Sequence, residues 1–253
     1  MNKKAIAGLL GAASLVTLAA CNNNKANNAS GESAAKASER KFPTEVSNEG
    51  TVVKGGTINY AIVSESPFKG LINPLLSIDS SDGALEDFAF ANLFEFDENQ
   101  RIKKDGGMME FTLDREKKTV TLKLRSKDYK WSDGQPLTID DYIFTYEFVG
   151  NKDYNGVRYD ENAENVVGME EFHAGKADKI SGLEKVDDQT VKIHLKEVYP
   201  ALEKGGNAIM SNILPKHIFK DMTYEQAIAS DAARTKVVGN GPFIVDKVVP
   251  GES

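Results

Sequence analysis

The sequence feature that most restricts the fold of this chain is a strict alternation of apolar and polar residues between Thr119 and Arg125. Valine or leucine occupies every second position in this stretch, and threonine, lysine or arginine fills the positions between. A period of two predicts a β-strand with one buried face. The preceding "MEFTL" alternates in the same way, and the charged "DREKK" separates the two segments. The pattern therefore predicts a β-hairpin.

Further strands are expected along the rest of the chain. The segment "KGGTINYAIV" alternates after a pair of glycines, "GLEKVDDQTVKIHLKE" alternates on both sides of an Asp-Asp turn, and "GNGPFIVDKVV" closes the chain. Between them, "NKDYNGVRYDENAENVVG" has many turn formers and no periodicity, which predicts a polar loop with exposed or half-exposed tyrosines.

Helices are predicted by their start signals. Ser81 or Asp82 precedes a run with helical spacing, and Thr138 stands three residues before Asp141, which is the spacing of a capping box. Residues 223–236 form a third helical pattern, again with a capping box at its start, and Pro200 begins a short helix. Because strands and helices do not alternate regularly, the fold class is α/β with mixed α+β lobes and not a doubly wound parallel sheet.

The first 20 residues have the pattern of a secretory signal peptide. Lys3 and Lys4 precede an apolar run of small residues that ends immediately before Cys21, the only cysteine in the chain. Leu18-Ala19-Ala20-Cys21 resembles the lipobox of bacterial lipoproteins, which predicts that Cys21 carries a lipid; the alternative is an incidental cysteine. Residues 21–53 are then a lipidated N-terminus and flexible tether, because they contain too few large apolar residues for a core.

Composition and motifs argue against several classes of function. The formal net charge is −7, so a basic face for nucleic acid is not expected, and one cysteine with three scattered histidines predicts no disulfide framework and no metal site. There is no nucleophile elbow, no His-Glu-x-x-His and no phosphate loop in the sequence. The adjacent acid pairs at 140–141, 170–171 and 187–188 fit helix starts, helix surfaces and turns. We expect no catalysis and no cofactor.

Several stretches in the same order resemble one family. They are "KGGTINYAI", "INPLL", "TVTLKLRSKDYKWSDGQPLTIDDYIFTYEF", "ISGLEKVDDQTVKIHLKEVYPALE", "ILPKHI" and "VVGNGPFIVDKVVPGES". They are similar to the peptide and nickel class of extracellular solute-binding proteins of ABC importers, above all to oligopeptide-binding lipoproteins of Gram-positive bacteria. The resemblance covers about residues 54–253 and corresponds to the N-terminal half of such proteins.

The resemblance implies a periplasmic-binding-protein-like fold of type II. Its first lobe would comprise residues 54–93 together with 181–253, and a second lobe, 94–180, would be inserted between them. A third lobe follows in the family, so the resemblance implies an incomplete fold in which the third lobe is absent.

The resemblance also implies where a ligand would lie. Ile78, Asp79, Ser80 and Ser81 match the edge of the cleft in the first lobe. The other candidates are Tyr154 or Tyr159 in the second lobe and, by position only, Asn207 and Asn240. A surface or turn role is an equally good interpretation of each of these residues.

The function implied is a substrate-binding lipoprotein for oligopeptide uptake, in a truncated or partial form. Its partners would be oligopeptides, ABC permease subunits and, through the lipid at Cys21, the extracellular face of the cell membrane. Two alternatives remain open at this point: a truncated surface lipoprotein that acts as an adhesin or peptide-signal sensor without transport, and an extracellular hydrolase, which the lack of the catalytic motifs named above disfavours.

Overall fold

A computed structural model describes residues 54–159, 163–206 and 208–249. The predicted signal peptide, the whole of the predicted tether with Cys21, and Asn207 lie outside the described residues. The chain divides into two compact units, Met1–Asn59 and Tyr60–Ser253, and the fold described below is that of the second unit.

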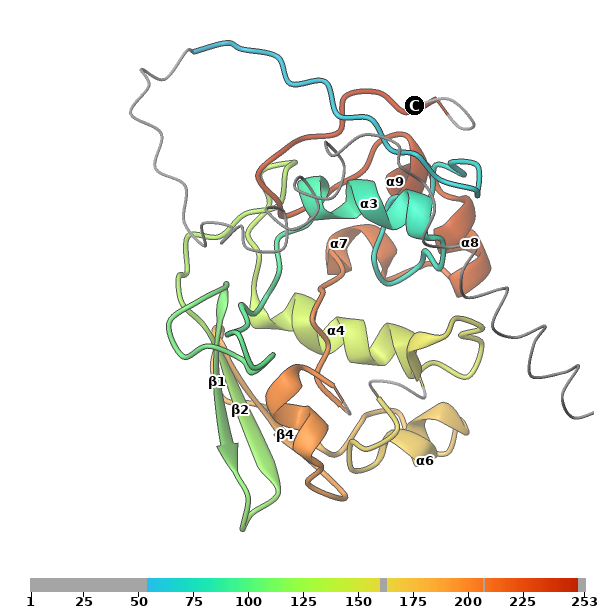
Figure 1. Ribbon diagram of the computed structural model, residues 1–253. Helices are drawn as coiled ribbons and strands as arrows, with labels where there is room; N and C mark the ends of the chain where they lie inside the picture. Colours follow the sequence, from blue (N-terminus) through green and yellow to red (C-terminus); the bar gives the residue numbers. More distant parts are fainter. Residues whose placement is uncertain (1–53, 160–162, 207, 250–253) are drawn as a thin grey trace, which may run out of the picture. The chain divides into compact units, whose positions relative to one another are not determined.

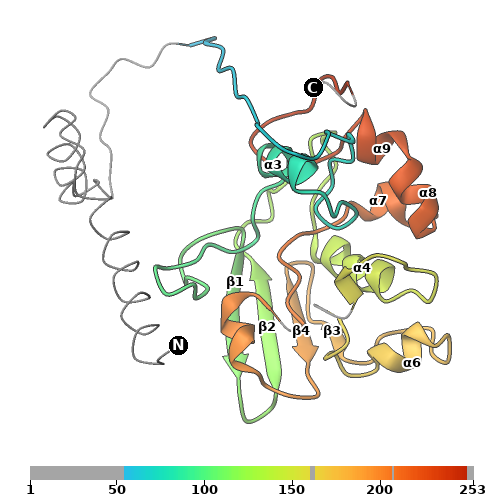
Figure 2. The same cartoon turned by 45° about the vertical axis from the view of Figure 1, so that its right-hand side comes forward.

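One antiparallel sheet of four strands organises this unit. The strands are β1 (Met109–Asp114), β2 (Thr119–Leu124), β3 (Leu183–Lys185) and β4 (Thr190–His194), in the order β1-β2-β4-β3 (Figure 2). The predicted hairpin and the strands flanking the Asp-Asp turn are thereby confirmed. The sheet joins strands from both sides of residue 180, where the lobe boundary was placed; the division into lobes stays a prediction, and a boundary there would cut the sheet.

The register of the sheet lines up the alternating apolar residues. Val120 stands opposite Leu113 on one side and Ile193 on the other, and Ile193 in turn pairs with Leu183. The central members, Val120 and Ile193, are fully buried. Cross-strand neighbours on one face are the unit of sheet stabilisation, so this row across all four strands explains why the register is fixed.

The other regular elements are helices, of which α4 lies next to the sheet and α7 lies next to α4 (Figure 1). The helices among the described residues are α3 (Ser80–Ala89), α4 (Ile139–Val149), α6 (Met169–His173), the 3-10 helix η1 (Pro200–Lys204), α7 (Lys216–Phe219), α8 (Tyr224–Ala229) and α9 (Asp231–Arg234). Among these residues no helix has the length and apolarity needed to cross a membrane.

The helix starts at Thr138 and Thr223 are confirmed, each with its capping box. The helix expected over 223–236 is wrong in its extent, because Ser230 adopts an extended conformation with ψ 151° and separates α8 from α9. The Ser230 hydroxyl donates to the carbonyl of Ala227 at 2.7 Å, a local bond with which serine competes against helix propagation.

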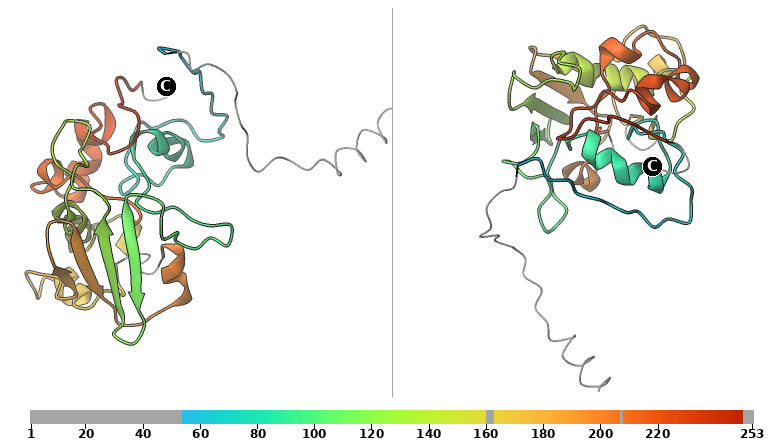
Figure 3. Two further views of the ribbon diagram at one scale, coloured as in Figure 1. Left: turned by 90° about the vertical axis from the view of Figure 1, so that its left-hand side faces the viewer. Right: turned by 90° about the horizontal axis from the view of Figure 1, so that it is seen from above.

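The strands predicted at 58–62 and in the closing segment are wrong. Neither forms a strand, and Ile58 and Ile244 are 89% and 72% exposed. Alternation produces a strand only where a neighbouring strand completes the hydrogen-bond ladder, and neither segment pairs with a strand among the described residues. The closing segment instead runs along α3, where the amides of Gly241 and Phe243 donate to carbonyls of the helix (Figure 3).

Two glycines allow that approach. A Cβ atom on Gly239 would lie 2.0 Å from the carbonyl oxygen of Ala89, and one on Gly241 would lie 2.5 Å from the Ala89 carbonyl carbon. Both distances are impossible for a side-chain carbon, so the space at the end of α3 requires glycine at both positions. A small apolar cluster of Ile72, Ala89, Phe90 and Val237 lies at this end of the helix.

Side chains of α4 hold residues 208–216, an irregular segment together with the first residue of α7, against the helix. The Tyr142 hydroxyl donates to the carbonyl of Met210 at 2.9 Å, and the Tyr146 hydroxyl accepts from the Met210 amide at 3.2 Å and donates to the Ala208 carbonyl. On the same helix, the Thr145 hydroxyl accepts from the Leu214 amide at 2.9 Å. These bonds satisfy buried backbone groups that have no strand partner.

Asp141 joins three parts of the chain at the start of α4. Its carboxylate accepts the backbone amide of Thr138 at 2.9 Å, the backbone amide of Lys216 at 2.9 Å and the indole N–H of Trp131 at 3.4 Å. Trp131 is 2% exposed, so its indole N–H bonds to Asp141 inside the core. Burial raises the pKa of Asp141, and the three donors oppose that shift.

Replacement of Asp141 by alanine should therefore destabilise the fold. Asp141→Ala removes the carboxylate half of the capping box and leaves buried donors without an acceptor, which we expect to lower the free energy of unfolding by about 3 kcal/mol. The matched control is Asp140→Ala, because the Asp140 side chain is 45% exposed and its ion pair with Lys185 at 2.8 Å contributes less than about 1 kcal/mol. Urea unfolding measures both, and equal losses in the two variants would contradict the role given to Asp141.

Candidate functional site

The loop before α3 is held by two buried polar side chains. The Asp82 carboxylate accepts the backbone amides of Lys69, Gly70 and Leu71 at 2.8 to 3.3 Å. The side-chain oxygen of Asn73 accepts the amide of Leu75 at 3.0 Å. Asp82 and Asn73 are each 1% exposed, so this loop has a defined shape where it meets the helix.

The predicted cleft-edge residues Ile78–Ser81 lie together at the start of α3. Ile78 is 74% exposed and Ser80 is exposed, whereas the Asp79 carboxylate forms an ion pair with Lys69 and the buried Ser81 hydroxyl donates to the carbonyl of Pro67 at 3.3 Å. Asp79, and neither Ser81 nor Asp82, is the N-cap residue. The ligand role of these four residues stays a prediction, and only Ile78 and Ser80 present exposed side chains for it.

A partly buried carboxylate lies in the same helix. Glu86 has one carboxylate oxygen that is buried and has no hydrogen-bond partner among the described residues. Burial raises the pKa of Glu86 to about 7, against the opposing effects of the Ser77 hydroxyl, the Arg158 charge and the Asn73 amide, while Asp82 raises it further. Glu86 therefore changes its charge near neutral pH, next to the predicted cleft edge.

The two tyrosines predicted from the loop after α4 have different surroundings. Tyr154 is 6% exposed, so the expectation of an exposed or half-exposed side chain is wrong for it. Its hydroxyl donates to the carbonyl of Leu75 at 3.3 Å, which brings this loop to the Asn73-Pro74 loop. Tyr159 is half-buried, as expected, and stacks on His173 with 4.0 Å between ring centroids.

Asn240 has a structural task in the described fold. Its side-chain oxygen accepts the amide of Ala91 at 3.2 Å, and its side-chain nitrogen lies 3.3 Å from the sulfur of Met108. These contacts tie the closing segment to the end of α3. Asn207 and Cys21 were also candidates, and both lie outside the described residues, so their roles stay predictions.

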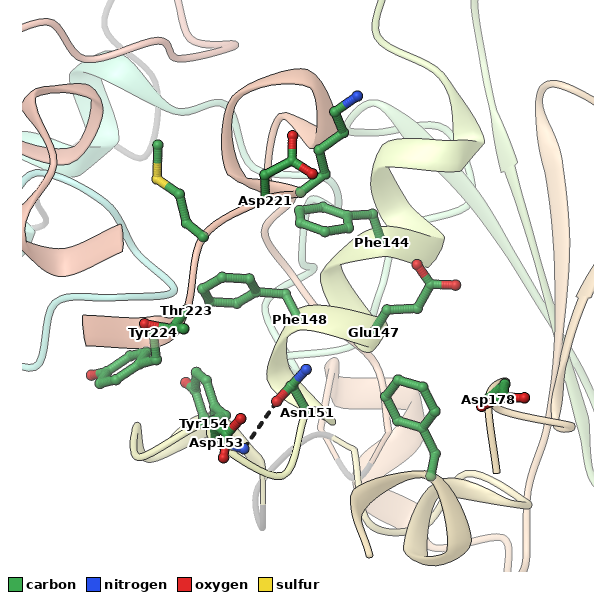
Figure 4. Close-up of a pocket in the computed structure, with 13 residues that line it drawn as sticks. Phe144, Glu147, Phe148, Asn151, Asp153, Tyr154, Asp178, Asp221, Thr223 and Tyr224 are labelled. Atoms are coloured by element: carbon green, nitrogen blue, oxygen red, sulfur yellow. Dashed lines mark hydrogen bonds between the residues drawn. The ribbon is translucent and has the colours of Figure 1, made fainter. Parts of the chain in front are cut away.

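A pocket of ≈ 500 Å³ lies beside α4 (Figure 4). Helix α4 contributes three of its side chains, and Figure 4 shows Phe144 and Phe148 projecting from the helix with Tyr154 and Tyr224 near Phe148. The remaining walls come from the loop after α4, from α6 and the turn after it, and from the link between α7 and α8. The lining residues are Phe144, Glu147, Phe148, Asn151, Asp153, Tyr154, Phe172, Asp178, Lys220, Asp221, Met222, Thr223 and Tyr224.

The pocket combines aromatic rings with acidic groups. Phe148 lies 6.0 Å from Phe144 and 6.1 Å from Tyr154, and Tyr154 lies 4.8 Å from Tyr224, all measured between ring centroids. Four of the lining residues are acidic and only one, Lys220, is basic. Burial raises the pKa of Glu147, as does the charge of Asp140, whereas Lys216 and Lys179 lower it.

A second pocket, of ≈ 540 Å³, lies along β1 and has balanced charges. Its lining contains the bases Arg101 and Lys104 and the acids Glu110 and Glu203, and Glu203 is paired with Arg115. No residue predicted from the sequence to bind a ligand lines this pocket. Within the described ranges, no group of three or more histidine, cysteine or acidic residues is placed to hold a metal ion.

Sequence reasoning predicted only Tyr154 among the residues of the pocket beside α4. The sequence does contain a pattern that could have indicated three more of them. Phe144, Glu147 and Phe148 have the spacing of residues that share one face of a helix, here α4. The acids Asp178 and Asp221 come from turns that are distant in sequence. Nothing local in the sequence indicates that they meet.

Comparison with protein families gives one match by a family model. Residues 108–253 match the model of the bacterial extracellular solute-binding proteins, family 5 Middle. The chain is 34% identical over 246 residues to the oligopeptide-binding protein OppA of Lactococcus lactis subsp. cremoris (strain SK11), which covers 93% of this chain and 40% of that protein. It is 26% identical over 238 residues to the oligopeptide-binding protein AppA of Bacillus subtilis (strain 168), covering 90% of this chain and 36% of that protein.

Solved structures give the same result for the fold. Lactococcal OppA, complexed with an endogenous peptide in the closed conformation, has a TM-score of 0.68 at 34% identity and covers 74% of this chain and 36% of that one. The substrate-binding protein CtaP of an ABC transporter from Listeria monocytogenes has a TM-score of 0.56 at 29% identity and covers 75% of this chain and 34% of that one. The predicted fold class is confirmed, and the chain spans about 40% of the length of the lactococcal relative.

The titration of Glu86 predicts a specific pH dependence of stability. Its folded-state pKa of about 7 exceeds its ordinary value of 4.5, so the folded chain binds this proton more tightly than the unfolded chain. The free energy of unfolding should therefore fall as pH rises from about 4.5 through about 7. Glu86→Gln keeps an acceptor for Ser77 and removes the ionisation. The fall in the free energy of unfolding across this pH range should therefore be smaller by about 2 kcal/mol, after allowance for partial exposure.

The exposed neighbour Asp87 supplies the control. Asp87→Asn should leave the difference in stability between pH 5 and pH 8 as it is in the parent chain, within about 0.5 kcal/mol. Denaturant unfolding of the three proteins across this pH range makes the comparison. If the free energy of unfolding of Glu86→Gln depends on pH as it does in the parent chain, the pH dependence does not come from Glu86.

Proposed function

The chain belongs to family 5 of the bacterial extracellular solute-binding proteins, and on this basis we propose that it forms part of an oligopeptide receptor of an ABC importer. The observation that carries the proposal is the likeness to lactococcal OppA at a TM-score of 0.68, because that protein was solved with a peptide bound. The relatives in Lactococcus and Bacillus are both named as oligopeptide-binding proteins.

The proposed mechanism is capture of a peptide by closure of lobes, followed by delivery to a permease. Hinged closure around a ligand is a general way in which binding proteins sequester small solutes. The chain spans about 40% of the length of the lactococcal relative, so it would supply only part of such a closing clamp. The proposal needs no covalent chemistry and no cofactor, and energy for transport would come from a separate ATPase.

We also propose that the protein is held at the extracellular face of the cell membrane by lipid on Cys21. The support is the sequence alone: a basic start, an apolar run and the Leu-Ala-Ala-Cys motif at its end. Two or more acyl chains anchor a protein stably, whereas one chain binds only marginally. The polar residues after Cys21 would then space the folded part from the membrane surface.

Deletion of the coding sequence should reduce peptide uptake. We expect cells without it to take up a labelled oligopeptide only at the rate of cells that lack the importer's ATPase, because a receptor supplies the peptide to the permease. Expression of the parent sequence from its own locus should restore uptake, and uptake of a free labelled amino acid serves as the control. Unchanged peptide uptake would overturn the transport proposal, and altered surface attachment or peptide response in the same cells would favour an adhesin or a sensor.

Replacement of Cys21 should release the protein from the membrane. Cys21→Ser removes the thiol that would be acylated, so the protein should move from the detergent phase to the aqueous phase in a phase-partition experiment and lose labelling by radioactive palmitate. Asn22→Ser, one residue later, is the matched control and should remain in the detergent phase. Retention of the serine variant in the detergent phase would show that Cys21 is not the anchor.

A further inference from the structure

We propose that the pocket beside α4 binds the guanidinium group of a small organic cation. The inference rests on the geometry and charge of this pocket and goes beyond the proposed function. Its volume of ≈ 500 Å³ lies within the range of roughly 300 to 1,000 Å³ that is usual for small-molecule sites.

The aromatic part of the pocket offers ring surfaces to a cation. Phe144, Phe148, Tyr154 and Tyr224 form a continuous series in which neighbouring ring centroids are 4.8 to 6.1 Å apart. The ring faces carry negative electrostatic potential, so a cation within about 6 Å of a ring centroid is attracted to it. Tyr154 is held in place by its bond to the Leu75 carbonyl, which means that this surface does not need to form when a ligand arrives.

The charged part of the pocket has the complementary sign. Glu147, Asp153, Asp178 and Asp221 line the same space as the rings, and Lys220 is the one base among the lining residues. None of these four carboxylates takes part in an ion pair within the described part of the chain. The lining therefore has an excess of three negative charges, in contrast to the balanced pocket along β1.

The cost of ionising Glu147 gives a reason for a bound cation to be retained. This carboxylate is partly buried on α4 beside Phe148, and its burial raises its pKa. A positive group placed next to it would offset the desolvation of the carboxylate. Glu147 is thus the acid that we expect to interact most strongly with the ligand.

Among cations, the guanidinium group fits this combination best. A metal ion needs several oxygen ligands at one point, and within the described residues no group of three or more acids, histidines or cysteines is so placed. A guanidinium group is planar and weakly hydrated, stacks on aromatic rings and binds carboxylates with two parallel hydrogen bonds. It can therefore use the rings and the carboxylates of the pocket at the same time.

Two probes of equal shape test the charge requirement on the full chain. N-acetyl-arginine amide carries the guanidinium group, and N-acetyl-citrulline amide replaces it with a neutral urea group of the same size. We expect calorimetric titration to detect the arginine compound only, with an affinity that falls as the salt concentration rises. Equal binding of the two compounds, or binding of neither, would overturn the proposal.

Substitutions in the pocket locate the binding. Asp153 and Asp221 are exposed, and their carboxylates make no hydrogen bond among the described residues, so Asp153→Asn and Asp221→Asn should leave the melting temperature unchanged. Each should weaken arginine binding about threefold, and the double variant about tenfold. Asp128→Asn, an exposed acid outside the pocket, should leave the affinity unchanged. Full affinity in the double variant would place the binding elsewhere and refute the site.

A further pair of titrations identifies the source of the cation. Glycyl-arginyl-glycine presents the same group inside a peptide, and agmatine presents it in a free amine. Binding of the tripeptide supports a basic side chain of a peptide as the ligand, and binding of agmatine alone supports a free cation. If neither compound binds and the arginine compound is not preferred over the citrulline compound, the site is refuted. The proposal of peptide transport is unaffected by that result, because the uptake experiment depends on no residue of this pocket.

Discussion

Helix α4 binds segment 208–216 through hydrogen bonds from its own side chains, and this contact positions α7 and the link that follows it. Tyr142, Thr145 and Tyr146 donate to or accept from backbone groups of the segment, which has no strand beside it to satisfy them. Asp141 fixes the far end of the segment at the Lys216 amide, where α7 begins. The link from α7 to α8 then closes the pocket over the side chains on an adjacent face of α4.

Features determined by neighbouring residues could be predicted from the sequence, whereas contacts between distant segments could not. The hairpin and the helix starts at Thr138 and Thr223 are local: each is determined by residues a few positions apart, and each is present in the structure. The alternation at 58–62 is equally regular, but alternation reports only that one face is suited to burial and does not supply a partner strand. The binding of segment 208–216 depends on residues more than 60 positions away, and no periodicity in the sequence indicates it.

The candidate site shows the same limit at the level of side chains. The sequence indicates Tyr154 as a candidate but does not indicate its burial, because its hydroxyl donates to the Leu75 carbonyl, 79 residues away. The sequence predicts Ser81 or Asp82 as the helix cap, whereas in the structure both side chains hold the preceding loop. Asp82 is an anchor for three backbone amides, a role that becomes visible only when the loop is seen folded back on the helix.

The glycines of this chain are required for two different reasons, and the difference sets how far its sequence can vary. Gly134 has φ +89° and open space around it, so an asparagine, which enters the left-handed region readily, would fit there. Gly239 and Gly241 are required by volume, because the carbonyl group of Ala89 already occupies the place of any side chain. Every homologue that packs this segment against α3 in the same way must keep both glycines. A Gly-x-Gly pair at this distance from α3 would therefore mark the contact in sequences too divergent to align elsewhere.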